Sequence, residues 1–474
     1  MIKMNNKFTS DIVIGLEIHV ELKTDSKLFC SCKRTGEEGE EPNSRTCPTC
    51  LGHPGSKPVL NNKAVEFAIK LALAANSKIS KELIFSRKSY FYPDMAKNYQ
   101  ISQYEIPLAT EGSIKLDSGK EINLTRIHLE EDPAALVHIG EMQKSPYVLV
   151  DYNRSGNPLV EVVTKPELIS PEEARDFMKQ LITTLSYLEI FDINSCIIKA
   201  DSNISIKETN YKRVEVKNIT GFKDIERAMK YEVMRQKQNP HEVKQETRAW
   251  DSKKGTTFPL RAKEIEEEYG YIIEPDLVKI ELTKDWIKDI EAKLPEMASA
   301  KLEKFTKKHK LTEEMAKIIS KDKKLAEIYE AVAVSVNPAL AAKWVRRELV
   351  RVLNYSKKKL DQTKITEKHL IDLLTLVQNK KITDATAQKI MEELIIVPFD
   401  VNEYVKLKSL EAVSDKGIIE KYCKEAIQES PQAIQDYKAG NEKALHFVVG
   451  IVMKKSKGKA TPKEVNDILK SFIK

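Results

Sequence analysis

The distribution of glycine and proline divides this sequence into two regions that must fold differently. Of the 16 glycines, 12 lie at or before Gly270, none lies in residues 271–416, and four follow. Of the 19 prolines, 14 lie at or before Pro275. Glycine and proline mark turns and interrupt helices. The sequence therefore predicts a turn-rich region with strands, followed by a region of helices.

Alternation of apolar and polar residues predicts strands in the first region. The clearest run is IVIGLEIHVEL at residues 12–22, whose second half alternates strictly. Two helices are expected, one at residues 63–75 and one after the capping box Ser170-Pro171-Glu172-Glu173. These patterns predict an α+β domain built on a largely antiparallel sheet. Its further strands are predicted at residues 122–129, 147–152, 159–163, 197–206 and 214–216.

Helical periodicity dominates from about residue 280 to the end of the sequence. Capped helix starts are predicted at Thr312, Thr366 and Thr383, and Thr461 precedes the last helix. We expect three domains. Residues 1–292 form the sheet domain, residues 293–405 an all-α linker domain, and residues 406–474 a small helical tail.

Composition favours a folded protein that carries a basic tail. The chain has 474 residues, of which 41% are hydrophobic and 31% charged, so packed cores are expected rather than disorder. It has no apolar run long enough to span a membrane and no apolar signal core at its start, which favours a cytoplasmic location. Residues 406–474 hold 14 Lys and nine acids, so they carry +5 of the formal charge of +7. This excess could attract RNA, or it could be an ordinary solvated surface.

Four of the six cysteines lie close together in the sequence. Cys30-Ser31-Cys32 precedes Cys47-Pro48-Thr49-Cys50, with 14 residues between the pairs. Four thiolates on two tight turns can close a tetrahedral structural zinc site. We therefore predict a zinc knuckle within residues 28–52, the alternative being four free structural cysteines.

The strongest strand also carries a candidate site on its polar face. Glu17, His19 and Glu21 share one face because side chains alternate along a strand. Two carboxylates and an imidazole could hold Mg²⁺ with a nucleotide, or they could be the solvent-facing side of a sheet. Neither glycine-rich phosphate-loop motif occurs, so any ATP site is of another kind. Further carboxylates lie on or beside predicted strands, namely Glu130, Glu131, Asp132, Asp151, Glu161, Asp201 and Glu215.

Residues 86–94, with the sequence SRKSYFYPD, interleave basic and aromatic side chains. Such a mixture can stack on nucleic-acid bases while it neutralises phosphate. An equally good interpretation is a strand that faces the core and carries Arg87 and Lys88 at its end.

Six segments stand in an order that is typical of one known family. They are IGLEIHVELKT (14–24), YFYPD (90–94), YQISQ (99–103), HLEED (128–132), QETR (245–248) and EPD (274–276). Over essentially its whole length the chain resembles the B subunits of the glutamine-dependent, heterotrimeric aspartyl/glutamyl-tRNA(Asn/Gln) amidotransferases. The tail residues 436–440 and 454–460 resemble the tRNA-binding terminal module of that family.

The resemblance implies an enzyme subunit with a two-step reaction in a cradle-shaped first domain. ATP phosphorylates the side-chain carboxylate of Asp-tRNA(Asn) or Glu-tRNA(Gln), and ammonia then displaces the phosphate. A partner amidase A subunit supplies the ammonia from glutamine, and a small C subunit completes the heterotrimer. The implied class is therefore a carbon–nitrogen ligase with glutamine as amido donor.

The resemblance also implies roles for individual residues. Those for Mg²⁺ and ATP are Glu17, His19, Glu131 or its neighbour Glu130, Asp201 and Glu215. Lys88 and Glu131 would line the ammonia exit, Tyr90 and Tyr92 would lie near the acceptor end of the tRNA, and Lys454, Lys455, Lys457 and Lys459 would contact tRNA phosphates. The alternative hypothesis is a non-catalytic RNA-binding protein with a zinc module and a basic tail. Binding of ATP at the face with Glu17 and His19 would distinguish the enzyme from this alternative.

Overall fold

The structure is a computed structural model that describes residues 10–139, 145–262, 270–412, 416–456 and 458–473. The chain divides into two compact units, Met1–Met297 and Ala298–Lys474. Among the described residues, no helix has the length and apolar character needed to cross a membrane.

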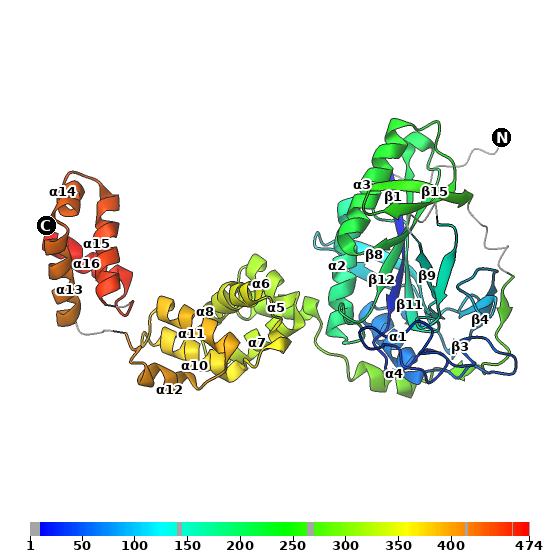
Figure 1. Cartoon of the computed structure of the whole chain (residues 1–474), viewed down its shortest axis with the longest axis horizontal. Helices are drawn as coiled ribbons and strands as arrows, with labels where there is room; N and C mark the ends of the chain where they lie inside the picture. Colours follow the sequence, from blue (N-terminus) through cyan, green and yellow to red (C-terminus); the bar gives the residue numbers. More distant parts are fainter. Residues whose placement is uncertain (1–9, 140–144, 263–269, 413–415, 457, 474) are drawn as a thin grey trace. The chain divides into compact units, whose positions relative to one another are not determined.

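A ten-stranded mixed sheet forms the centre of the first unit (Figure 1). The strand order is β15-β14-β13-β12-β1-β11-β8-β6-β2, and β7 pairs with β8 beside this path. Neighbours are antiparallel except β13 and β14, which are parallel. The expected α+β class with a largely antiparallel sheet is therefore confirmed. The strands are β1 (Ile12–Glu21), β2 (Lys78–Ile79), β6 (Ala109–Thr110), β7 (Ser113–Lys115), β8 (Glu121–Glu131), β11 (Pro158–Thr164), β12 (Ile198–Ile206), β13 (Val214–Thr220), β14 (Glu246–Asp251) and β15 (Thr256–Ala262).

The two faces of β1 have different environments. Ile14, Leu16, Ile18 and Val20 are at most 1% exposed and belong to one large apolar core. Residues from α1 (Asn62–Ala74), α2 (Pro171–Tyr187) and α3 (Phe222–Gln238) complete that core, and Figure 1 shows α2 and α3 alongside the sheet. The helices therefore cover the apolar face, which leaves the face with Glu17 and His19 for polar side chains.

Shorter elements surround the large sheet. β4 is the middle strand of a three-stranded sheet in the order β16-β4-β5, and β9 pairs with β10 and β3 with β17. The bounds are β3 (Glu82–Leu83), β4 (Ser86–Ser89), β5 (Tyr99–Ser102), β9 (Ala135–His138), β10 (Val148–Asp151), β16 (Ile272–Ile273), β17 (Ile280–Glu281), the 3₁₀ turn η2 (Lys207–Thr209) and α4 (Lys284–Glu291).

The expectation of two helices among the strands was wrong, because α3 is a third. Its N-cap is Gly221, at φ +84°, which makes no side-chain hydrogen bond. The sequence therefore has no capping motif that would predict the start of this helix. Its buried residues Ile225, Ala228, Met229 and Val233 nevertheless follow helical spacing. The helix start at Ser170 is confirmed, since the Ser170 hydroxyl accepts a hydrogen bond from the Glu173 amide.

The second unit is helical in all its described elements. The Thr312 and Thr383 side chains cap α6 and α11 as expected, and Thr366 forms a capping box with His369. Its elements are α5 (Ala298–Lys307), α6 (Glu313–Ser320), α7 (Lys323–Ala333), α8 (Pro338–Lys343), the π-helical η4 (Trp344–Leu349), α9 (Val350–Ser356), the 3₁₀ turn η5 (Leu360–Gln362), α10 (Glu367–Gln378), α11 (Asp384–Ile396), α12 (Val401–Leu407), α13 (Lys416–Glu429), α14 (Pro431–Lys438), α15 (Glu442–Lys455) and α16 (Pro462–Ile473).

Two separate apolar clusters lie in this unit. One runs from Phe305 to Val405 along the chain and the other from Ile419 to Ile473. The proposed division into domains at 292/293 and 405/406 stays a prediction.

The apolar contact between α2 and the sheet gives a stability prediction. Phe177 is fully buried in the large apolar core that also contains Ile14, Leu16 and Ile18 of β1. Phe177→Ala should reduce the stability of the first unit by about 3–5 kcal/mol, because it removes apolar contacts and leaves a cavity. Hydrogen exchange of the α2 amides, followed by mass spectrometry, would measure this loss. Lys179→Ala, at an exposed position of the same helix, should leave the exchange unchanged, and equal effects would contradict the packing described here.

Candidate active site and cysteine cluster

Strand pairing gathers charged side chains on the polar face of the sheet. His19 lies opposite Lys199 of β12 and Glu161 of β11, and Glu161 lies opposite His128 of β8. Directly opposed residues share a face of a sheet. Four neighbouring strands therefore contribute to a single row, Lys199–His19–Glu161–His128.

The centre of this row is a tight cluster of two imidazoles and two carboxylates. His19 Nε2 is 3.3 Å from Glu130 Oε1 and 3.4 Å from Glu161 Oε2. His128 Nε2 is 3.4 Å from Glu161 Oε2 and 3.8 Å from Glu130 Oε2. Glu130, Glu161 and His128 are buried, and His19 is partly exposed. The cluster is therefore reached from the His19 side.

Charge pairing governs ionisation in this cluster. Burial would lower the pKa of His19, but its hydrogen bond to Glu161 and the charge of Glu130 raise that pKa to about 10. Burial opposes ionisation of Glu161, yet His128 and His19 hold its pKa below the ordinary value. Burial also opposes ionisation of Glu130, but the hydrogen bond from His128 and the charge of His19 lower its pKa, so both carboxylates are kept ionised.

The same cluster can hold a cation, which would replace the proton on the His19 nitrogen that faces Glu130 and Glu161. One nitrogen of His19 and one oxygen each of Glu130 and Glu161 all lie within 4.8 Å of one another. Two carboxylates suit Mg²⁺, which takes its remaining ligands from water and phosphate oxygens. The donor set therefore fits a divalent cation that also contacts a nucleotide.

Adjacent glutamates of β8 face in opposite directions. Glu130 joins His19, whereas Glu131 Oε1 accepts from the Ile101 amide at 2.8 Å and pairs with Lys97. Alternation along the strand requires this separation. Of the two glutamates named from the sequence, the structure thus brings Glu130 to His19 and leaves Glu131 on the β5 side.

A second group of charged side chains lies around Glu17, which precedes His19 by two residues on the same face of β1. Glu17 is opposite Asp201, and its Oε1 accepts from Asn203 Nδ2 at 2.9 Å. Lys217 Nζ of β13 is 3.8 Å from Asp201 Oδ2 and 3.7 Å from Glu215 Oε1. The predicted residues Glu17, Asp201 and Glu215 are therefore neighbours, and Lys217 adds a cation that sequence reasoning missed.

Glu21 has a structural partner instead. Its Oε1 lies 3.0 Å from Arg34 Nη1, and each side chain is 4% exposed. Asn157 and the Ile197 amide also donate to this carboxylate. Since Arg34 follows Cys32 by two residues, this buried pair ties the cysteine segment to β1.

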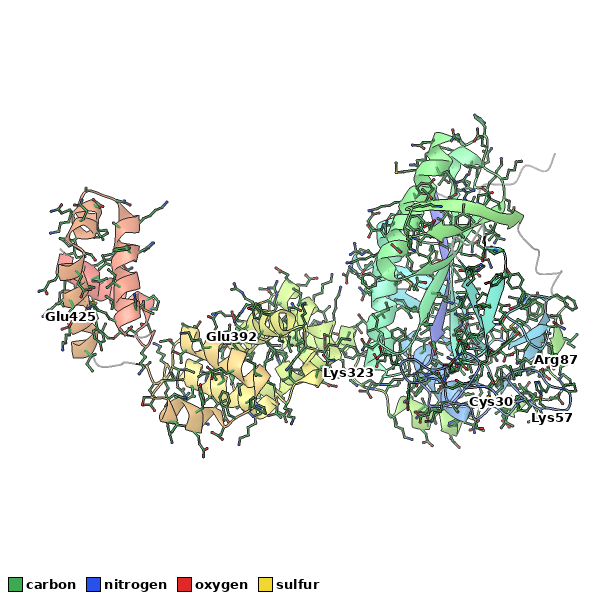
Figure 2. The ribbon with its side chains drawn as sticks, viewed as in Figure 1. Cys30, Lys57, Arg87, Lys323, Glu392 and Glu425 are labelled. Carbon is green, nitrogen blue, oxygen red and sulfur yellow. The ribbon has the colours of Figure 1, made fainter. Side chains whose placement is uncertain are left out.

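The small sheet with Lys88 adjoins the site through β5. Ser102 of β5 donates to Glu130 Oε2 at 3.2 Å. Lys88 and Tyr90 are partly exposed, and Tyr92 is 51% exposed. Arg87, labelled in Figure 2, makes a double contact with Glu274 at 2.7 and 2.8 Å. The basic and aromatic segment is therefore anchored at Arg87 and exposed at Tyr92.

The four predicted zinc ligands converge. Cys30, Cys32, Cys47 and Cys50 each offer a sulfur within 4.8 Å of the others. Cys47 and Cys50 Sγ are 3.8 Å apart, close to the spacing of about 3.8 Å that follows from tetrahedral Zn–S bonds of about 2.3 Å. A hydrogen bond from Cys30 lowers the pKa of Cys50 to about 4. The donor set therefore fits a closed zinc site.

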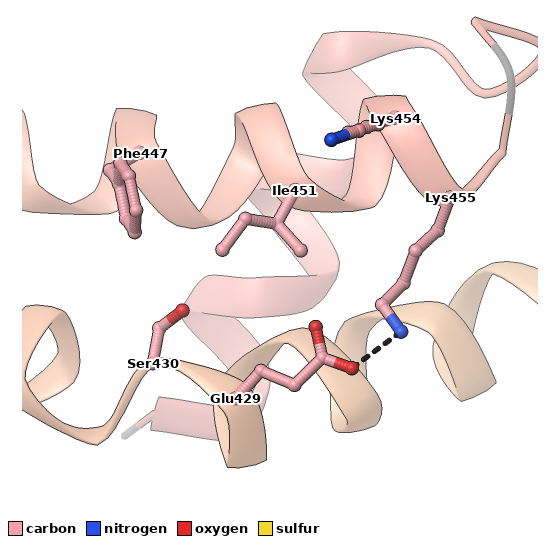
Figure 3. A pocket seen from close by; sticks show the side chains of 6 residues that line it. All are labelled: Glu429, Ser430, Phe447, Ile451, Lys454 and Lys455. Atoms are coloured by element: carbon pink, nitrogen blue, oxygen red, sulfur yellow. Dashed lines mark hydrogen bonds and ion pairs between the residues drawn. The ribbon is translucent and has the colours of Figure 1, made fainter.

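The tail lysines differ in what they contact. Figure 3 shows Lys454 beside a pocket lined by Phe447 and Ile451, while Lys455 turns toward Glu429. Lys455 Nζ is 2.7 Å from Glu429 and 3.0 Å from Glu425. Lys459 is partly exposed, and Lys457 lies outside the described residues. Lys454 is therefore better placed than Lys455 to meet a phosphate.

Sequence reasoning missed two members of the central cluster. Glu161 was noted only as a carboxylate on a strand, and His128 only as part of a motif. Counting alternate positions in residues 159–163 places Glu161 on the polar face. Without the pairing of β1 with β11 and of β11 with β8, however, nothing in the sequence brings these side chains to His19.

Comparison with known proteins gives matches over nearly the whole chain. Residues 12–288 match the GatB/GatE catalytic domain, and residues 326–473 match a GatB domain. The B subunits of aspartyl/glutamyl-tRNA(Asn/Gln) amidotransferases from several organisms are similar throughout. The one from Carboxydothermus hydrogenoformans is 40% identical over 98% of both chains. The one from Caldanaerobacter subterraneus subsp. tengcongensis is 41% identical over 98% of this chain and 99% of the relative. The one from Thermotoga maritima is 40% identical over 97% of this chain and 98% of the relative.

Proposed function

Because this chain belongs to the GatB family of tRNA-dependent amidotransferase B subunits, we propose that it activates and amidates the amino acid on misacylated tRNA. The enzyme is a carbon–nitrogen ligase that uses glutamine as amido donor, and its substrates are Asp-tRNA(Asn), Glu-tRNA(Gln) or both. The family and function expected from the sequence are confirmed by these relatives. The observation that carries the assignment of the site is the convergence of His19, Glu130 and Glu161.

The chemistry requires charge neutralisation above all. A carboxylate has a poor leaving group, so ATP must first convert it to an acyl phosphate that ammonia can attack. A divalent cation held by Glu130, Glu161 and His19 would neutralise phosphate charge during this transfer. Glu17, Asp201 and Glu215 would orient the nucleotide and its cation, and the Lys217 ammonium would contact a phosphate. These residues act by positioning, which suits phosphoryl transfer.

The surrounding residues complete the proposal. Lys88 and Glu131, on the β4–β5 side, would line the ammonia exit. Tyr90 and Tyr92 would meet the acceptor end of the tRNA. The partners would be an amidase A subunit that releases ammonia from glutamine and a small C subunit. A cytoplasmic location, where translation supplies the tRNA, belongs to the same proposal.

The alternation of β8 gives a sharp test of the site. Glu130→Gln keeps the shape of the side chain but removes its charge. It should lower ATP-dependent formation of Asn-tRNA(Asn) and Gln-tRNA(Gln) by at least about 100-fold, because loss of a direct ligand should cost no less than the upper end of the range for residues that only orient a ligand. It should leave tRNA affinity unchanged. The assay uses the chain purified with its partners, glutamine and MgATP.

Two variants on the same strand serve as comparisons. Glu121→Gln, at an exposed position of β8, should retain full amidation. A larger loss in Glu131→Gln than in Glu130→Gln would contradict the assignment of Glu130. If the unmodified complex bound tRNA without consuming ATP or forming product, the non-catalytic RNA-binding hypothesis would replace this proposal.

We further propose that the cysteine cluster binds one structural zinc ion. The purified protein should contain about one zinc per chain, and Cys47→Ser should remove it because the site needs four thiolates. Metal analysis of both proteins measures this. Cys423→Ala, which changes a buried cysteine in the tail core, should keep its zinc. Metal-free wild-type protein with unchanged thermal stability would contradict a structural role.

The tail should bind tRNA phosphates through Lys454. Lys454→Ala should weaken tRNA binding and reduce the slope of log affinity against log salt by about one, as for loss of one phosphate contact. Lys455→Ala should have a smaller effect, because that ammonium is already paired with two carboxylates. Filter binding at several salt concentrations measures both, and equal effects of the two variants would be inconsistent with this assignment.

A further inference from the structure

Lys27 is a fully buried lysine beside the cysteine cluster. Its relative exposure is 0%. The Nζ atom donates to Arg45 O at 2.9 Å and Tyr152 O at 3.3 Å, and it lies 3.8 Å from Cys50 Sγ. Lysine side chains are almost never fully buried without a charged partner. The partner of this one must therefore be identified.

No carboxylate serves that purpose. Within the part of the chain that the structure describes, no acidic oxygen lies within the 4.0 Å ion-pair distance of Lys27 Nζ. Two carbonyl oxygens satisfy part of the hydrogen-bonding capacity of the ammonium but carry no net charge. A buried ammonium without a compensating anion would be strongly destabilising. The Cys50 thiol, 3.8 Å from the ammonium, can become an anion.

Lys27 also connects the two halves of the cluster. Its backbone amide donates to Cys32 O at 2.9 Å, in the first cysteine pair, while its ammonium reaches Cys50 in the second. Gly156, at φ +84°, lies beside both residues, because a Cβ there would be in ordinary contact with Lys27 Cδ at 3.6 Å and with Cys50 Cβ at 3.7 Å. The lysine is thus enclosed on the protein side of the cluster.

We infer that Lys27 is the built-in counter-ion of the zinc-bound cysteine cluster, with its ammonium donating to the Cys50 thiolate. The inference rests on the zinc site proposed above. Four thiolates around Zn²⁺ carry a net charge of −2, which a buried ammonium reduces to −1. A charge-assisted hydrogen bond to a ligand sulfur also fixes its orientation. Lys27 is accordingly a positioning residue for the metal site and has no part in the amidation chemistry.

The test is metal affinity in the full-length protein. Lys27→Met keeps an unbranched side chain of similar length and removes the charge. It should weaken Zn²⁺ binding at least about tenfold, the lower end of the range for outer-shell partners, in competition with a chromophoric chelator. Lys33→Met, at an exposed position between the cysteine pairs, should bind Zn²⁺ as the wild type does.

Further measurements separate the role of the charge from general destabilisation. Co²⁺ substituted into the site should show a tetrahedral thiolate spectrum in both wild type and Lys27→Met, with the affinity alone reduced. If Lys27→Met does not fold, Lys27→Gln keeps hydrogen bonds to the carbonyls without the charge and should show the same loss of affinity. Unchanged Zn²⁺ affinity in the variant that folds would overturn this inference alone. A wild-type protein that binds no zinc would overturn the zinc site as well.

Discussion

Strict alternation along β1 is the constraint on which the first unit depends. The even-numbered side chains Ile14, Leu16, Ile18 and Val20 are buried in the apolar core, so the odd-numbered ones must face the other way. Hydrophobic burial thereby fixes where Glu17 and His19 point. Covering the apolar face with α1, α2 and α3 leaves the opposite face open for polar chemistry. The interactions that stabilise the sheet and the arrangement that serves the reaction are two consequences of the same sequence pattern.

Buried charge on the polar side is compensated locally. Arg34 neutralises Glu21 at 3.0 Å, and protonated His19 compensates the charge of Glu130 and Glu161. In this setting a buried ion pair contributes little net stability, but the loss of one partner is costly. The pairs therefore act mainly as constraints on geometry. Arg34 joins the cysteine segment to the end of β1, so the cysteine cluster and the candidate active site are connected through one strand.

The sequence alone predicted most elements and part of the site. Alternation and capping residues identified β1, β8, β11, β12, α1 and α2, because those signals are local. The helix α3 was not predicted, because Gly221 provides no side-chain cap at its start. The cysteine cluster was predictable, since two short spacings bring its ligands together. Glu161, His128, Lys217 and Lys27 were not assigned, because their roles depend on strand pairing and burial between residues far apart in the chain.

The distinction between Glu130 and Glu131 shows how strand register selects chemistry. A shift of β8 by one residue would exchange the two glutamates and would also turn Ile127 and Leu129, both fully buried, out of the core. The apolar residues thus hold the register that presents Glu130 to His19. The same argument applies to β11, where Val160 and Val162 are fully buried and Glu161 lies between them. The free energy of core burial, rather than attraction among the charged groups, therefore specifies which carboxylates meet.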